Sequence, residues 1–204
     1  MKEQTNVKEK NIEEDKEETQ DQDEPPSWHL SSHRKIVLDI ETTDLHPANG
    51  QLICIGVKET DTGITRVFFD RNERLMVQRF IDFFNKGDFQ EVIGYNLFFD
   101  TRFIFGKCLR YNIPMGSFYR ARYNDLMQTV KSVKNRYSTN RPGSLNSWVK
   151  FIFGKSKTLK NASVPHLFHE GKISDIVAYN KMDVTLTHML WKRVNLVLEG
   201  VENG

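Results

Sequence analysis

Short apolar runs and helical repeats alternate along the chain from residue 35 onward. The short runs predict strands at residues 35–40, 51–57, 65–69, 91–95 and 118–123. Apolar side chains recur at close to helical spacing over residues 72–85, 99–111, 126–133 and 145–153, and from residue 174 to about 198. Ser144 is a suitable N-cap for the fourth of these helices. This order predicts an α/β domain with a mixed central β-sheet flanked by helices.

The first 26 residues differ from the rest in composition. They carry 4 basic and 10 acidic residues, a net charge of −6, and almost no apolar side chain. Such a segment buries too little apolar surface to offset its ordering entropy, which predicts a disordered acidic tail that ends at Pro25-Pro26. Residues 27–204 are expected to form one domain. Their 25 basic and 17 acidic residues give a net charge of +8, which favours an acidic partner.

Several classes of protein do not fit this sequence. The two cysteines, Cys54 and Cys108, lie in apolar patterns and are expected to be reduced, buried thiols. No apolar run approaches the roughly 20 residues that span a bilayer. The charged N-terminus has no hydrophobic segment of the kind that a secretory signal needs. We therefore expect a cytoplasmic, intracellular protein that does not bind a membrane.

Two acidic residues stand at the end of the first predicted strand. Asp39 and Glu41 are two positions apart, so both side chains share one face, roughly 6.5–7 Å apart at the backbone. Such a pair is also typical of simple strand-end polarity. Because function in α/β sheets lies at strand ends, a catalytic pair is the second interpretation.

For two further carboxylates, a purely structural and a catalytic role are again both open. Asp100 falls in the first turn of a predicted helix, where the helix dipole by itself favours an acid. Asp183 follows Tyr179 by four residues in the last helix, so the two share a face beside the apolar stripe. The purely structural interpretation is a solvated Asp183 and a core Tyr179.

Taken together, the four carboxylates indicate metal chemistry. At one edge of a sheet they would repel one another, and burial would raise their pKa values. Divalent cations relieve this repulsion, and a set of oxygen ligands favours Mg²⁺ or Mn²⁺ over zinc. Two such ions about 3.5–4 Å apart can hold the attacking and leaving oxygens of a phosphoryl transfer.

Three motifs resemble those of the DEDD exonuclease superfamily, the proofreading nucleases with a ribonuclease H-like fold. The resemblance runs from Lys35 to Leu198. The stretch from Val37 to Leu45, which holds Asp39 and Glu41, resembles the first motif, and Asn96 with Asp100 the second. Tyr179 with Asp183 resembles the third in its tyrosine form (DEDDy), because the position at which the sister class has His is Ala178.

The resemblance implies a metal-dependent 3′→5′ exonuclease that releases nucleoside 5′-monophosphates from single-stranded DNA or RNA with a free 3′ end. Asp39, Glu41, Asp100 and Asp183 would bind two divalent cations, Mg²⁺ or Mn²⁺. Tyr179 would position the attacking water. We expect the substrate at the following residues: Thr42, Leu45, Asn96, Phe99, Lys131, Arg136, Arg141 and Lys155.

The last four of these residues belong to a stretch without acidic side chains. From Leu126 to His169 the chain has no Asp or Glu and eight Lys or Arg residues, which favours nucleic-acid binding over a merely solvated basic face. The interleaved aromatic residues Trp148, Phe151 and Phe153 are expected to pack in the core.

Two alternatives to the exonuclease stay open. The first is a non-catalytic nucleic-acid-binding or scaffold module on the same fold, although the carboxylate set is complete. The second is an endonuclease or a structure-specific ribonuclease that uses the same metals. The acidic tail can recruit a protein partner, compete for the basic face or aid solubility.

Overall fold

The computed structural model describes residues 33–133, 143–155 and 163–200. The expected acidic tail and the expected substrate residues Arg136 and Arg141 lie outside these ranges. Within them, no helix is long and apolar enough to cross a membrane.

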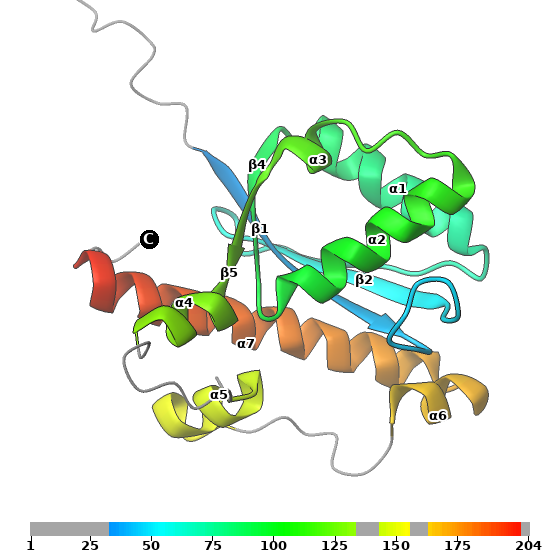
Figure 1. The fold of residues 1–204 in the computed structure, drawn as a ribbon. Coiled ribbons are helices and arrows are strands. Elements are labelled where there is room, and N and C mark those ends of the chain that lie inside the picture. The colour runs from blue at the N-terminus through cyan, green and yellow to red at the C-terminus, as the bar shows by residue number, and fades with distance from the viewer. Residues whose placement is uncertain (1–32, 134–142, 156–162, 201–204) are drawn as a thin grey trace, which may run out of the picture. The chain divides into compact units, whose positions relative to one another are not determined.

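Five strands and seven helices make up the described fold (Figure 1). In chain order they are β1 (Arg34–Thr42), β2 (Leu52–Glu59), β3 (Thr65–Phe68), α1 (Glu73–Lys86), β4 (Phe89–Gly94), α2 (Leu97–Tyr111), α3 (Ser117–Arg120), β5 (Arg122–Asp125), α4 (Leu126–Val133), α5 (Leu145–Phe153), α6 (Val164–His169) and α7 (Ile173–Glu199). The sheet order is β3-β2-β1-β4-β5. Because β1, β2 and β3 pair antiparallel while β1, β4 and β5 pair parallel, the sheet is mixed, as expected.

Local capping explains several element boundaries. The Asn72 side chain accepts the Leu75 N–H at the start of α1, and Ser144 accepts the Ser147 N–H at the start of α5. At the end of α2, Asn112 adopts the left-handed conformation that terminates many helices.

Two elements differ from the sequence-based expectation. The strand predicted at residues 118–123 is wrong in its first half, because residues 117–120 form the short helix α3 and only β5 is extended. Phe118 sets this geometry, since its ring is fully buried between Phe80 and Phe84 at centroid distances of 5.2 and 5.0 Å. Helix α6 was not predicted; its N-cap Ser163 precedes a single short segment of six residues.

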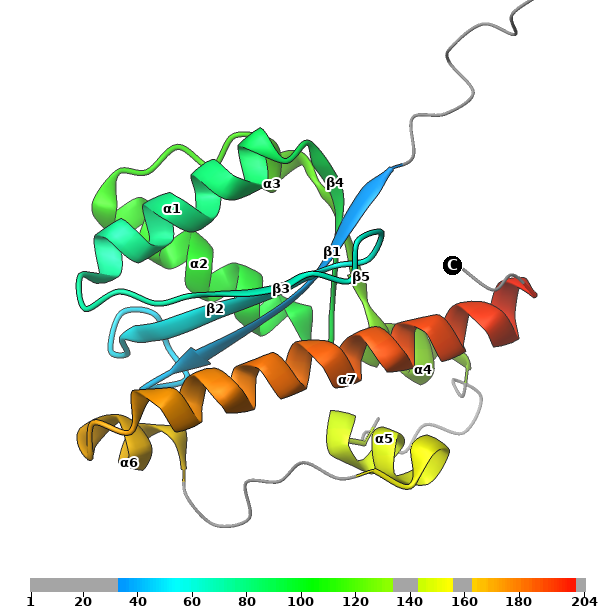
Figure 2. The same ribbon diagram turned by 180° about the vertical axis from the view of Figure 1, so that it is seen from behind.

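The sheet lies between two different layers of helices (Figures 1 and 2). Helices α1, α2 and α3 cover one face and enclose the largest hydrophobic cluster, which is rich in phenylalanine. The long helix α7 crosses the other face against β1, β2 and β3. The carboxylates of Asp39, Glu41 and Asp183, described next, meet between the sheet and α7.

A second hydrophobic cluster joins α5 to α7. Trp148 and Phe153 are half-buried against it, as expected. Phe151 is 81% exposed, so its expected place in the core is wrong. Cys54 and Cys108 are buried free thiols, as expected.

Candidate active site

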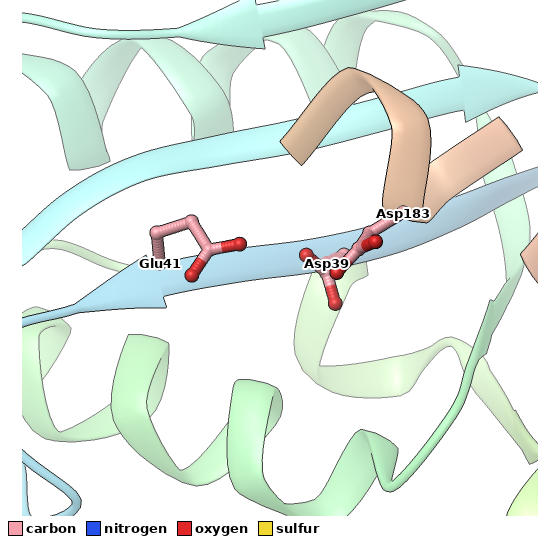
Figure 3. Close-up of side chains that lie close together, drawn as sticks. All are labelled: Asp39, Glu41 and Asp183. Carbon is pink, nitrogen blue, oxygen red and sulfur yellow. The ribbon is translucent and has the colours of Figure 1, made fainter. Parts of the chain in front are cut away.

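The alternation of side chains along β1 directs two carboxylates towards α7. Ile36, Leu38 and Ile40 enter the phenylalanine-rich cluster on one face. Asp39 and Glu41 therefore point to the other face, where Asp183 of α7 meets them (Figure 3). One carboxylate oxygen from each of the three residues lies within 4.8 Å of the others. This set could hold a metal ion.

A β-bulge sits beside Glu41. The residue opposite Glu41 on β2 is Cys54, but the residue opposite Thr42 is Leu52, so β2 has one extra residue at this point. Bulges bend a strand and redirect its side chains, and they are frequent next to active sites. The loop that follows β1 is anchored by buried Lys107, whose Nζ donates to the Gly50 carbonyl over 2.6 Å.

Asp100 approaches the same strand from the opposite layer. It lies in the first turn of α2, is 4% exposed, and accepts the N–H of Ile40 over 3.0 Å. Ile40 separates Asp39 from Glu41, so Asp100 adjoins the three-carboxylate cluster without being part of it. Burial raises the pKa of Asp100 well above its usual value, and the Asp39 carboxylate raises it further.

The negative potential extends to the neighbouring strand. Burial raises the pKa of the Cys54 thiol, and the carboxylates of Glu41 and Asp39 raise it further. These effects favour the protonated thiol in the metal-free protein, and Cys54 is not one of the three residues of the cluster. The donors in this cluster are oxygen atoms, which fit hard divalent cations such as Mg²⁺, Mn²⁺ or Ca²⁺.

Helix α7 contributes two more side chains near the cluster. Tyr179 is half-buried one turn before Asp183, where the shared helix face was expected. Asn180 is fully buried, and its side-chain amide donates to the Asp39 carboxylate. Sequence reasoning assigned no role to Asn180, although it lies inside the third motif.

The substrate residues expected near the cluster occupy different environments. Leu45 is 77% exposed on the loop after β1, while the Thr42 hydroxyl donates to the Asp44 carbonyl over 2.7 Å. Asn96 is exposed, and its side chain makes no capping hydrogen bond to α2. Phe99 is half-buried and packs against Phe103 of the core at 5.9 Å. Their roles in substrate binding stay predictions.

Phe98, which the sequence did not single out, has the more accessible ring. It is 69% exposed, and the Arg102 guanidinium lies 5.7 Å from its ring centroid. Arg102 also donates to the Leu45 carbonyl over 3.0 Å. Arg102 therefore contacts both the ring of Phe98 and the backbone of Leu45.

Two of the expected basic contacts lie in the described ranges. Lys131 is exposed on α4, and Lys155 is exposed just after α5. Both belong to the acid-free stretch, and their contact with nucleic acid stays a prediction.

Comparison with known proteins identifies the family. The family model for the RNase_H superfamily matches residues 36–195, so the chain belongs to the RNase_H superfamily. The expected ribonuclease H-like fold is thereby confirmed, and the family together with the acidic cluster indicates a nuclease.

Two individual proteins show the range of this similarity. An uncharacterized protein of Methanocaldococcus jannaschii is 31% identical over 105 residues, which are 50% of this chain and 58% of that protein. The solved structure of a family B DNA polymerase from Pyrobaculum calidifontis matches 80% of this chain with a TM-score of 0.63 and 18% identity. The match covers only 24% of the polymerase, and at this identity it shows a shared fold.

Proposed function

We propose that this protein is a 3′→5′ exonuclease of the DEDDy type that requires Mg²⁺ or Mn²⁺. It hydrolyses the terminal phosphodiester of single-stranded DNA or RNA and releases a nucleoside 5′-monophosphate. The observation that carries the proposal is the convergence of Asp39, Glu41 and Asp183 within 4.8 Å, with buried Asp100 against the same strand.

In this proposal, the four carboxylates hold the divalent cations. When bound, such cations stabilise negative charge on the attacking and leaving oxygens of phosphoryl transfer. Tyr179, one turn before Asp183, orients the water by hydrogen bonding. The water oxygen bonds to phosphorus, the bond from phosphorus to the 3′ oxygen breaks, and that oxygen takes a proton.

Exposed apolar groups at the start of α2 and on the loop after β1 favour a single-stranded substrate. Leu45 and Phe98 present surfaces on which unpaired bases can pack, and Arg102 adds a cation beside the ring. Asn96, Phe99, Thr42, Lys131 and Lys155, with Arg136 and Arg141 outside the described ranges, complete the proposed contacts. The matched polymerase is a nucleic-acid enzyme by its name, which agrees with this substrate class.

The test is digestion of 5′-labelled single-stranded DNA and RNA of matched sequence with Mg²⁺, Mn²⁺ or EDTA. We expect a ladder that shortens from the 3′ end only when metal is present. The Asp39→Asn/Glu41→Gln variant should lose this activity. The matched control Asp82→Asn removes an exposed carboxylate on α1, in the other layer, and should keep it.

A blocked 3′ end separates exonuclease from endonuclease. Degradation of the blocked oligonucleotide into internal fragments would replace the proposal with an endonuclease. Binding without any metal-dependent cleavage would replace it with the non-catalytic module.

A further inference from the structure

Asn180 of α7 holds Asp39 through two hydrogen bonds. Its Nδ2 donates to the Asp39 carbonyl over 3.1 Å and to the Asp39 Oδ2 over 2.9 Å. The donor assignment follows from chemistry, because a carbonyl and a carboxylate can only accept. One amide group thus connects the backbone and the side chain of Asp39 to the helix that carries Asp183.

Gly56 of β2 makes room for this contact. It lies opposite Asp39 in the antiparallel ladder. A Cβ atom at position 56 would lie 1.9 Å from the Asn180 Oδ1 and 2.8 Å from its Cγ. Any larger residue at this position would therefore displace the Asn180 side chain from Asp39.

The arrangement is costly for stability alone. Asn180 is fully buried, and its Oδ1 has no hydrogen-bond donor among the described residues. A buried acceptor without a partner destabilises the folded state, because the hydrogen bonds that it makes with water in the unfolded chain are lost. An apolar side chain in the same space would avoid this cost, so packing does not explain an amide at this position.

We propose that Asn180 is a positioning residue that orients Asp39 for metal binding, and that Gly56 is the residue that permits it. The inference rests on the proposed metal-dependent function. Asn180 and Asp183 lie three residues apart on one face of α7, so the Asn180–Asp39 contact sets the separation of Asp39 from Asp183. It acts through Asp39 and needs no contact with the metal.

Three variants test this inference by Mn²⁺ titration calorimetry, which reads affinity without substrate. Asn180→Ala should weaken Mn²⁺ binding by about 10- to 100-fold, the loss typical of a residue that supports a metal ligand. Gly56→Ala should weaken it to a similar extent although it removes no polar group. The double variant Gly56→Ala/Asn180→Ala should bind Mn²⁺ like Asn180→Ala alone, because both changes disrupt one contact.

Asn124→Ala is the matched control. The Asn124 amide donates to the buried Glu91 carboxylate over 3.0 Å, on the same sheet but away from the cluster. This variant loses a comparable hydrogen bond and should bind Mn²⁺ like the wild type. Thermal unfolding in EDTA checks folding, and the double variant should be more stable than Gly56→Ala because the added methyl group no longer meets Asn180.

The outcomes separate this inference from the proposed function. Wild-type protein that binds Mn²⁺, with folded Asn180→Ala or double variant binding it equally well, overturns the inference and leaves the function standing. Wild-type protein that binds no Mn²⁺ and cleaves no oligonucleotide overturns both. Weak binding by the Asn180 variants beside a normal Asn124→Ala supports the positioning role.

Discussion

The two faces of the sheet differ in chemistry although the same strands supply both. Towards α1, α2 and α3 the strands present Ile and Leu side chains to a cluster of phenylalanine rings. Towards α7, β1 presents Asp39 and Glu41. Helix α7 itself contributes four buried polar residues: Asn180, Asp183, Thr187 and His188. Burial lowers the pKa of His188 to about 4, so its imidazole is neutral at pH 7.

One small domain thereby combines a stable core with a charged site. Burial of apolar surface on the phenylalanine-rich face offsets the desolvation of carboxylates on the other. The two faces should therefore respond differently to substitution, one in the free energy of unfolding and the other in activity.

The largest effect on stability is expected on the phenylalanine-rich face. Phe80→Ala removes a fully buried ring that contacts Phe68, Phe84 and Phe118, and should lower the free energy of unfolding by about 3–5 kcal/mol. Urea unfolding measures this change. Activity per folded molecule should be retained; a selective loss of activity would mean that the two faces are not separable.

Asp183→Asn tests the opposite face. Loss of one charge from the three-carboxylate cluster should lower kcat/KM by more than about 100-fold, the upper range for residues that only support a ligand. Stability in EDTA should hold or rise, since repulsion within the cluster decreases. Oligonucleotide digestion and thermal unfolding measure the two effects, and full activity in the variant would remove Asp183 from the site.

Asp100 sharpens the comparison because it comes from the phenylalanine-rich layer and reaches the charged strand. Its pKa is raised in the folded protein, so the folded state holds this proton more tightly than the unfolded chain does. The free energy of unfolding of the metal-free protein should therefore fall as pH rises from about 3.9, the pKa of an Asp in the unfolded chain, through the pKa of Asp100 in the folded protein.

Asp100→Asn has no carboxyl group to titrate at this position. In EDTA the variant should be more stable than the wild type above the folded pKa, and this advantage should shrink on acidification. Denaturant unfolding across pH measures it. If the difference in free energy of unfolding between variant and wild type does not vary with pH, ionisation of the Asp100 carboxyl does not destabilise the folded protein.

The smallest effect is expected at the exposed ring of Phe98 on α2. Phe98→Ala should weaken binding of a single-stranded oligonucleotide by about 1–3 kcal/mol, the contribution of one stacked base, without loss of stability. Fluorescence anisotropy with Ca²⁺ in place of Mg²⁺ measures it. Phe105→Ala, at a half-exposed ring on the same helix, is the control. Equal binding by the two variants would exclude a stacking role for Phe98.

Much of the fold and the acidic residues were predictable because the relevant signals are local. Period-2 alternation placed Asp39 and Glu41 on one face of β1, and the four-residue spacing placed Tyr179 beside Asp183. The Ser144 cap marked the start of α5. Each signal depends on residues within one turn or one strand.

Other features depended on contacts between distant residues. Residues 117–120 form α3 instead of the expected strand because the Phe118 ring fills a space between two residues of α1. Neighbouring Phe98 and Phe99 are equally aromatic in sequence, and only packing of α2 on the sheet exposes one and half-buries the other.

The proposed site residues, the acids and the tyrosine, could be named from the chain alone, because their spacing and alternation are local signals. How they are held depends on the folded arrangement, since Asn180 reaches Asp39 across 141 residues and needs Gly56 of a third element to do so. The physical reason is that a carboxylate's orientation depends on the hydrogen bonds and free space around it, and here both come from elements far apart in the chain.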